Sequence, residues 1–400
     1  MINNVLETNF VGITMANPLM TASGCFGFGL EYKDYFDPNE LGGIVVKGLT
    51  LEQRDGNSGI RIAETPSGML NSVGLENPGI EYFENVIVNE IKKNINVPII
   101  ANINGRTVEE YIELASRIEN IDEVHGIELN ISCPNVKDGG MAFGANKDMA
   151  GRVTKEVRKV TRKPLIVKVS PNVTNIVEIS KIVEENGADA ISMINTLLGM
   201  SIDTRTRKPI LGNTFGGLSG PAVKPVALRM IYQVSNEVSI PILGMGGISN
   251  LEDALQFIFA GASTIALGTS FFPNPLVALE IKQGLRFKSL DGNMTGTVVA
   301  VDYLDDFSVY FIWDGEKEVN SWFGNDCDCE VLKDEDNLIY STKEVKKELL
   351  VRQEDFNRAL LKFANQKLKD KSSKLFGLMA DAEKPIQSYS HSIDKDNKIR

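Results

Sequence analysis

A chain of 400 residues, with 42% hydrophobic and 24% charged residues, has the composition of an ordinary globular protein, and its length favours two domains. The formal net charge of −11 argues against a nucleic-acid backbone as the main partner, because phosphate contacts need clustered Lys and Arg. No apolar run reaches the roughly 18 residues of a membrane helix. The first twenty residues also lack the basic cluster and apolar core of a signal peptide. We therefore expect a cytoplasmic protein that binds neither nucleic acid nor membrane.

Cysteine and histidine are scarce in this chain. The four cysteines are Cys25, Cys133, Cys327 and Cys329. They are too few and too scattered for a disulfide framework, which agrees with a reducing compartment. Cys327 and Cys329 have no Cys or His partners nearby, so we interpret them as loop thiols and expect no metal site. A Ser-His-Asp site would depend on His125 alone, because His391 lies in a polar tail.

The distribution of glycine divides the chain at about residue 286. Thirty of the 35 glycines lie in residues 1–285, whereas both tryptophans lie beyond them. We therefore predict a first domain over 1–286 and an appended small α+β extension. The extension divides into a small β domain of unknown role over 287–340, and a charged helix with a disordered tail over 341–400.

Eight short apolar runs alternate with amphipathic stretches in the first domain. The runs are Pro18–Ala22, Gly43–Val46, Pro98–Ile103, Gly126–Ile131, Pro164–Val169, Ala188–Ile194, Pro241–Met245 and Ser263–Leu267. Strand and helix in alternation predict a parallel sheet, and eight strands in about 285 residues predict a (β/α)₈ TIM barrel. An open doubly wound sheet is the alternative, but no G-x-G-x-x-G turn follows the first run.

Polar residues or glycines stand at the ends of these runs. They are Ser23, Lys47, Asn102, Asn130, Lys168, Asn195, Gly246 and Gly268. Barrel enzymes place their chemistry at the C-terminal ends of the strands, and Lys or Asn is costly to bury there without a role. A single residue of this kind is explained by snorkelling to solvent or by capping a turn. Five of them on five strands predict a shared pocket.

Two glycine turns follow the last two runs, at residues 244–247 and at Gly268-Thr269. Loops in these positions commonly hold a phosphate through backbone N–H groups, so we expect a phosphorylated ligand, either FMN or a sugar phosphate. Lys168 would then place a fixed cation beside a ring that gains negative charge on reduction, as a flavin does. The alternative is a Schiff-base lysine of an aldolase.

A cysteine lies just beyond the fourth run, in the segment Asn130–Asn135. Cys133 is the best-placed acid–base candidate, because histidine is scarce and neighbouring lysines lower a thiol pKa. The alternative is a buried, inert thiol, which is our interpretation of Cys25. The side-chain amides of three asparagines suit a planar ring with alternating C=O and N–H groups, such as a pyrimidine, or else cap loops. These asparagines are Asn71, Asn130 and Asn195.

Seven segments of the first domain carry the motifs of a known family. They are ASGCFGFG at 22–29, MLNSVGLENPG at 69–79, ELNISCPNVKDGGMAFG at 128–144, VKVSPNV at 167–173, INT at 194–196, GGLSGPAVKP at 216–225 and GMGGI at 244–248. On these segments the chain resembles the dihydroorotate dehydrogenases of pyrimidine biosynthesis, over about residues 1–285. It most resembles the class 1B catalytic subunit, a cytoplasmic FMN flavoprotein. The residues that follow match nothing in the family.

The resemblance implies oxidation of (S)-dihydroorotate to orotate in de novo pyrimidine (UMP) biosynthesis. Cys133 would be the catalytic base that removes the C5 proton, while hydride passes from C6 to FMN N5. The implied substrate-binding residues are Lys47, Asn71, Ser72, Val73, Gly74, Leu75, Asn130, Asn195 and Thr196. The implied FMN-binding residues are Ser23, Lys47, Gly48, Asn102, Asn130, Lys168, Ile194, Gly220, Gly246, Gly247, Gly268 and Thr269.

The class 1B resemblance also implies partners. Electrons would pass to NAD⁺ through a subunit that holds FAD and a 2Fe-2S cluster, in a heterotetramer built on a homodimer core. A class 1A enzyme, which reduces fumarate without a partner subunit, is the alternative. The VKDGGMAFG continuation after Asn135 favours class 1B. From other functional classes, a non-catalytic flavin-binding adaptor acting through the C-terminal extension, or a flavoenzyme reducing tRNA uridines, stays open. The acidic net charge disfavours the latter.

Overall fold

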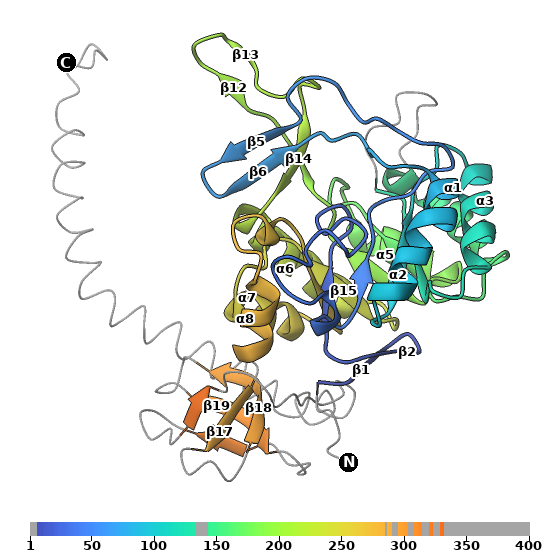
Figure 1. Cartoon of the computed structure of the whole chain (residues 1–400). Helices are drawn as coiled ribbons and strands as arrows, with labels where there is room; N and C mark the ends of the chain where they lie inside the picture. The colour runs from blue at the N-terminus through green and yellow to red at the C-terminus, as the bar shows by residue number, and fades with distance from the viewer. Residues whose placement is uncertain are drawn as a thin grey trace, which may run out of the picture. The chain divides into compact units, whose positions relative to one another are not determined.

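The computed structural model describes residues 6–132 and 143–282 with their side chains. It also describes the backbone of residues 283–284, 286–289, 295–302, 308–313, 320–322 and 329–331 (Figure 1). The predictions for Cys133, Cys327 and residues 341–400 therefore lie outside the described residues. The chain forms two compact units, and the first contains everything from the N-terminal strands to Phe287.

Eight parallel strands of the first unit form one sheet. They are β3 (Leu19–Thr21), β4 (Ile44–Val45), β7 (Ile99–Ile103), β8 (Gly126–Asn130), β9 (Leu165–Lys168), β10 (Ala190–Met193), β15 (Ile242–Met245) and β16 (Thr264–Leu267). Each strand lies beside its neighbours in chain order, and β16 pairs with β3. A parallel bridge between Met20 and Gly43 joins β3 to the segment of β4. The predicted (β/α)₈ TIM barrel is confirmed.

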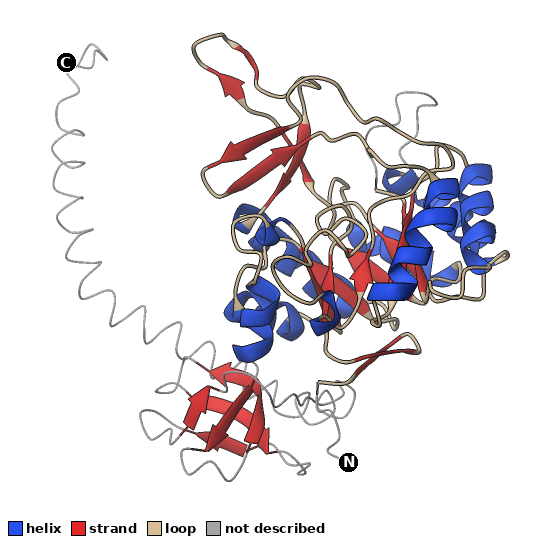
Figure 2. Ribbon diagram, in the orientation of Figure 1, coloured by secondary structure: helices blue, strands red, loops and turns tan. Residues whose placement is uncertain are grey.

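Helices surround the barrel, as Figure 2 shows in blue around the red strands. They are α1 (Ile80–Tyr82), the π-helix η2 (Phe83–Ile87), α2 (Val88–Asn94), α3 (Val108–Glu119), α4 (Lys147–Arg158), α5 (Ile176–Glu185), α6 (Lys224–Ser235), α7 (Leu251–Phe259) and α8 (Val277–Gly284). Asn or Thr side chains accept hydrogen bonds from the first-turn N–H groups of four helices. These N-caps are Thr107, Asn146, Asn175 and Asn250.

The barrel interior changes from apolar to polar along its axis. The apolar layers contain Met20, Val45, Ile100, Ile166, Ala190, Leu243, Met245 and Ala266. A hairpin of β1 (Thr8–Phe10) and β2 (Ile13–Met15) closes the N-terminal end, where Phe10, Ile13 and Met15 join this cluster. On several strands, the next residues that point into the barrel, toward its C-terminal end, are polar. Side chains on a strand alternate between faces, so this polar layer lies on the inside of the barrel.

A small antiparallel sheet lies at the C-terminal end of the barrel and was not predicted. Its four strands are β5 (Ile62–Thr65), β6 (Gly68–Asn71), β11 (Leu197–Gly199) and β14 (Gly216–Ser219), and a separate hairpin joins β12 (Ile202–Asp203) to β13 (Lys208–Pro209). The first pair belongs to the connection after β4, and the second pair to the connection after β10. β4 and β10 lie on opposite sides of the eight-stranded ring. Pairing of β6 with β14 therefore spans the barrel mouth.

Most of a five-stranded sheet, in the order β20-β19-β18-β17-β21, belongs to the second unit. The strands are β17 (Arg286–Ser289), β18 (Thr295–Asp302), β19 (Ser308–Trp313), β20 (Asn320–Trp322) and β21 (Cys329–Val331). The β18–β19 pair is antiparallel, with a register shift between Val298 and Ala300. Across the described segments of the whole chain, no helix combines the length and apolar character of a membrane span.

Candidate functional site

A buried ion pair lies at the C-terminal end of the barrel. Lys168 ends β9, and its side chain is only 6% exposed. Its Nζ lies 3.6 Å from Oε2 of Glu128 on the adjacent β8, whose side chain is fully buried. The same Oε2 accepts a hydrogen bond from the side-chain amide of Asn102 on β7. Among the described residues, the other carboxylate oxygen of Glu128, Oε1, has no hydrogen-bond partner.

A row of hydrogen-bonded side chains runs on from this pair, and we call it the polar row: Asn102, Asn104, Asn130, Ser132 and Asn195. Asn104 Nδ2 donates to Asn102 Oδ1 at 2.7 Å, and Asn130 Nδ2 donates to Asn104 Oδ1 at 2.8 Å. Ser132 Oγ donates to Asn130 Oδ1 at 2.5 Å, and Asn195 Nδ2 donates to Ser132 Oγ. Every member therefore has a fixed donor and acceptor side.

The antiparallel sheet brings a further predicted residue to the end of this row. Thr196 N donates to Asn195 Oδ1 at 2.7 Å. A Cβ placed on Gly217 of β14 would lie 2.1 Å from Thr196 Oγ1, so β14 runs directly against Thr196. Gly217 pairs with Asn71 of β6, and Asn71 Nδ2 donates to Gly217 O at 3.4 Å. Three predicted substrate residues, Asn71, Asn195 and Thr196, are thus held together across the mouth.

The predicted substrate loop, residues 72–75, is fixed by the asparagine that follows it. Asn77 Oδ1 accepts hydrogen bonds from Thr50 N at 3.2 Å and from Gly79 N at 2.9 Å, and its Nδ2 donates to Leu75 O at 2.7 Å. Glu76 forms an ion pair with Arg61 at 2.5 Å. The hydrogen bond from Arg61 is the main cause of a lowered Glu76 pKa, and the charges of Arg61 and Lys47 add to it. Lys47 therefore lies within electrostatic reach of this loop.

Glycines allow the turns after β14 and β15 to pack closely against each other. Gly220, Gly246 and Gly247 have φ angles of +96°, +127° and +85°, which side chains other than glycine rarely adopt. A Cβ on Gly247 would lie 2.7 Å from the carbonyl oxygen of Gly220. A Cβ on Gly246 would lie 3.3 Å from Ile194 Cγ1, and Thr269 begins the short helix η5 (Thr269–Phe271) after Gly268. The turns at Gly220 and Gly246–Gly247 thus pack against each other, Gly268–Thr269 follow β16 beside β15, and we call these three turns the glycine cradle.

Cys25 lies beside this cradle, since a Cβ on Gly268 would lie 3.7 Å from its Sγ. Shielding from water raises the pKa of the Cys25 thiol to about 11, and the nearby charge of Lys168 only partly opposes that rise. The thiol is therefore protonated at neutral pH, which agrees with our interpretation of Cys25 as structural.

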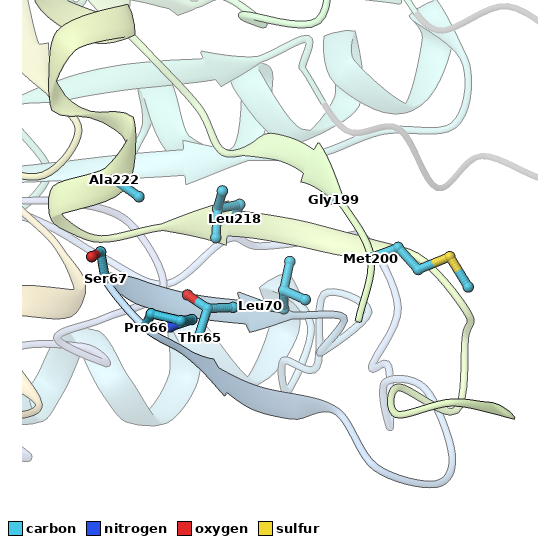
Figure 3. A pocket seen from close by; sticks show the side chains of 8 residues that line it. All are labelled: Thr65, Pro66, Ser67, Leu70, Gly199, Met200, Leu218 and Ala222. Atoms are coloured by element: carbon cyan, nitrogen blue, oxygen red, sulfur yellow. The ribbon is translucent and has the colours of Figure 1, made fainter. Parts of the chain in front are cut away.

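Two open pockets lie away from the polar row. One, of about 340 Å³, opens on the antiparallel sheet (Figure 3) and is lined by Thr65, Pro66, Ser67, Leu70, Gly199, Met200, Leu218 and Ala222. The other, of about 580 Å³, lies at the N-terminal end of the barrel and is lined by Val11, Gly12, Ile13, Thr14, Asn96, Pro98, His125 and Pro164. Neither is lined by a predicted site residue, so the strand-end residues and not these pockets define the candidate site.

All predicted site residues in the described part of the chain lie at the C-terminal end of the barrel or in the loops beyond it. Cys133 directly follows Ser132 and lies outside the described residues. The sequence interpretation missed Glu128, Asn104 and Ser132. A detectable signal existed for Glu128, because a carboxylate in the middle of the apolar run Gly126–Ile131 is costly to bury without a partner.

Comparison with known proteins gives a consistent result. A family model described as dihydroorotate dehydrogenase matches residues 5–288. The chain is 57% identical over 281 residues to the dihydroorotate dehydrogenase B (NAD(+)), catalytic subunit, of Brachyspira hyodysenteriae, covering 70% of this chain and 92% of that protein. The protein of the same name from Halalkalibacterium halodurans is 56% identical over 274 residues, covering 68% of this chain and 89% of that protein. The one from Malacoplasma penetrans is 49% identical over 312 residues, covering 78% of this chain and 97% of that protein.

Proposed function

The chain belongs to the dihydroorotate dehydrogenase family, and on that premise we propose that it oxidises (S)-dihydroorotate to orotate in pyrimidine biosynthesis, with NAD⁺ as the final electron acceptor. The observation that carries this proposal is the polar row, which sets amide groups beside a buried lysine at the mouth of a TIM barrel. Fixed amides suit a planar ring with alternating C=O and N–H groups.

The residues at the mouth fit FMN. The turns of the cradle at Gly220 and Gly246–Gly247 pack too closely to accept a side chain, and backbone N–H groups in such glycine turns, together with those of Gly268–Thr269, suit a phosphate. Lys168 would supply a cation for the negative charge that a flavin ring gains on reduction. We assign FMN binding to these residues together with Ser23, Lys47, Gly48, Asn102, Asn130 and Ile194. When bound, FMN supplies the hydride acceptor.

The polar row and Asn71 leave donors for the substrate. A side-chain amide has two N–H groups, and the hydrogen bonds within the protein use one each on Asn71, Asn130 and Asn195. Within the described part of the chain, no further hydrogen bond uses the second N–H of these amides, so we assign it to a carbonyl of the substrate ring. Lys47, near the loop of residues 72–75, would pair with the substrate carboxylate, and Thr196 closes the other side of the ring.

Cys133 is the group that we assign to proton removal from C5. Its neighbour Ser132 is fixed by hydrogen bonds to Asn130 and Asn195, so the chain enters the cysteine segment from a defined position at the mouth. Cys25 is unsuitable as a base at neutral pH, because its pKa is raised to about 11. His125 precedes β8 and so lies at the opposite end of the barrel.

Transfer of electrons to NAD⁺ needs a route out of the barrel. We propose a partner subunit that carries FAD and a 2Fe-2S cluster, joined to this chain in a heterotetramer with a homodimer core. The relatives named above support this, because each is named as the catalytic subunit of an NAD(+)-linked enzyme. A fumarate-reducing enzyme would need no such partner.

An anaerobic titration of the FMN-loaded protein with dihydroorotate tests the proposal. We expect stoichiometric bleaching of the visible flavin band, followed by recovery of the band when an acceptor is added. Recovery with NAD⁺ only in the presence of the partner subunit supports the NAD⁺ route, whereas recovery with fumarate alone would replace it. A yellow protein that does not bleach would refute dihydroorotate oxidation.

A further inference from the structure

Glu128 is a fully buried carboxylate on the inner face of the barrel. Its neighbours on β8, Ile127 and Leu129, belong to the apolar cluster between sheet and helices. Because side chains alternate along a strand, Glu128 faces the barrel interior together with Lys168 and Asn102. A charge is costly in this place, so its presence calls for an explanation.

Stability gives a poor explanation for this ion pair. Buried ion pairs replaced by apolar side chains of similar volume often leave a protein equally stable or more stable. Glu128 also keeps one oxygen, Oε1, without a hydrogen-bond partner among the described residues, which adds to the cost of burying it. The pair therefore points to a role in the chemistry at the barrel mouth.

The direction of the polar row gives a second observation. Each member donates toward Glu128: Asn195 to Ser132, Ser132 to Asn130, Asn130 to Asn104, Asn104 to Asn102, and Asn102 to the carboxylate. A carboxylate is an acceptor only, so it fixes the orientation of the first amide, and each amide fixes the next. Hydrogen bonds aligned in one direction also polarise one another.

We propose that Glu128 is a positioning residue that holds the Lys168 ammonium and the Asn102 amide at the barrel mouth, and that its charge lowers the reduction potential of the flavin bound there. This inference rests on the proposed FMN binding. Lys168 alone would favour the reduced, more negative ring, and the adjacent carboxylate cancels part of that effect. The site thereby stays close to neutral before reduction.

The midpoint potential of the bound flavin in the Glu128→Gln variant tests this proposal. Glutamine keeps the size of the side chain and an acceptor for Asn102 but removes the charge. We expect the midpoint potential to rise by about 30 mV. For a two-electron couple this is about a tenfold increase in the preference for reduced over oxidised flavin. The affinity for oxidised FMN should change less than the affinity for reduced FMN. Loss of packing alone would weaken both redox forms equally and leave the potential unchanged.

Asp189→Asn is the matched control. Asp189 is also a carboxylate paired with a cation, Arg158, but it directly precedes β10 and so lies at the N-terminal end of the barrel. We expect Asp189→Asn to lower thermal stability and leave the potential unchanged. An unchanged potential in FMN-loaded Glu128→Gln, or an equal rise in both variants, would overturn the proposal. A wild-type protein that binds no FMN would instead refute the proposed function, and this inference with it.

A measurement on the unmodified protein decides the matter if Glu128→Gln does not fold. The infrared difference spectrum between reduced and oxidised FMN-loaded protein, with ¹³C-labelled glutamate, reports carboxylates that respond to flavin charge. We expect a glutamate carboxylate band to shift on reduction, because Glu128 lies in a dry interior beside Lys168. A spectrum without any glutamate band would overturn the proposal.

Discussion

Gly247→Ala tests whether the glycine cradle is the phosphate site. Gly247 has a φ of +85°, where a side chain costs roughly 1–2 kcal/mol of backbone strain. Its new Cβ would lie 2.7 Å from the carbonyl oxygen of Gly220, and ordinary contact begins at 3.4 Å. The two turns must therefore separate by about 0.7 Å.

This separation moves backbone donors away from a phosphate. A hydrogen bond to a charged group contributes about 1.5–3 kcal/mol, and every 1.4 kcal/mol is about tenfold in affinity. Loss of one such bond therefore predicts that FMN binds about 10- to 100-fold more weakly. Quenching of FMN fluorescence on titration with the apoprotein measures this directly, and thermal unfolding measures the cost in stability.

Gly261→Ala is the control for strain alone. Gly261 has a φ of +106°, and a Cβ there would lie 2.4 Å from the side chain of Ser235. It lies between α7 and β16, at the N-terminal end of the barrel. Both variants should lose stability, and only Gly247→Ala should lose FMN affinity. Equal FMN affinity in Gly247→Ala and the wild type would refute the placement of the phosphate.

Three further predictions concern the catalytic base, a thiol pKa and the substrate loop. Cys133→Ala should keep FMN bound and lower turnover of dihydroorotate about 10²- to 10⁴-fold in steady-state assays, and full turnover would exclude Cys133 as the base. Because the Cys25 pKa is raised from 9.0 to about 11, its thiolate fraction at pH 8 is about a hundredfold lower than for an ordinary thiol. Peptide mass spectrometry should place the midpoint of Cys25 alkylation near pH 11, and a midpoint near 9 would contradict its shielding from water. Asn77→Ala leaves the N–H groups of Thr50 and Gly79 without their acceptor, so urea unfolding should show a loss of about 2–4 kcal/mol. The KM for dihydroorotate should rise with FMN affinity unchanged, and an unchanged KM would separate this loop from the substrate.

The barrel strands could be predicted because they are buried on both faces. Such strands are continuous apolar runs in the sequence, as at Pro98–Ile103, where the structure has β7 over Ile99–Ile103. The antiparallel sheet could not be predicted in the same way. Its strands are three to four residues long and contain several glycines, and the Asn71–Gly217 pair is separated by 146 residues in the chain. Local patterns carry no information about such a pairing.

The candidate site was predictable residue by residue but not as a network. Strand ends identified Lys47, Asn102 and Asn130 because a polar residue after an apolar run is conspicuous. The sequence interpretation placed Lys168 over the mouth as a fixed cation without naming a partner for it, and the structure buries it against Glu128. That contact joins neighbouring strands across 40 residues of chain, so it depends on the register of β8 against β9.

The polar row also links the two halves of the proposed reaction. We assign one end, beside Glu128 and Lys168, to the flavin and the other end, at Asn195, to the substrate. Since each amide is oriented by its neighbour, a change at one end reorients donors at the other without any direct contact between the two. Substitutions along the row should therefore be non-additive, because they disturb one aligned set of hydrogen bonds and not several independent ones. We therefore expect the polar row, which follows the ends of β7, β8 and β10, to couple the electrostatics of the flavin site to the geometry of the substrate site.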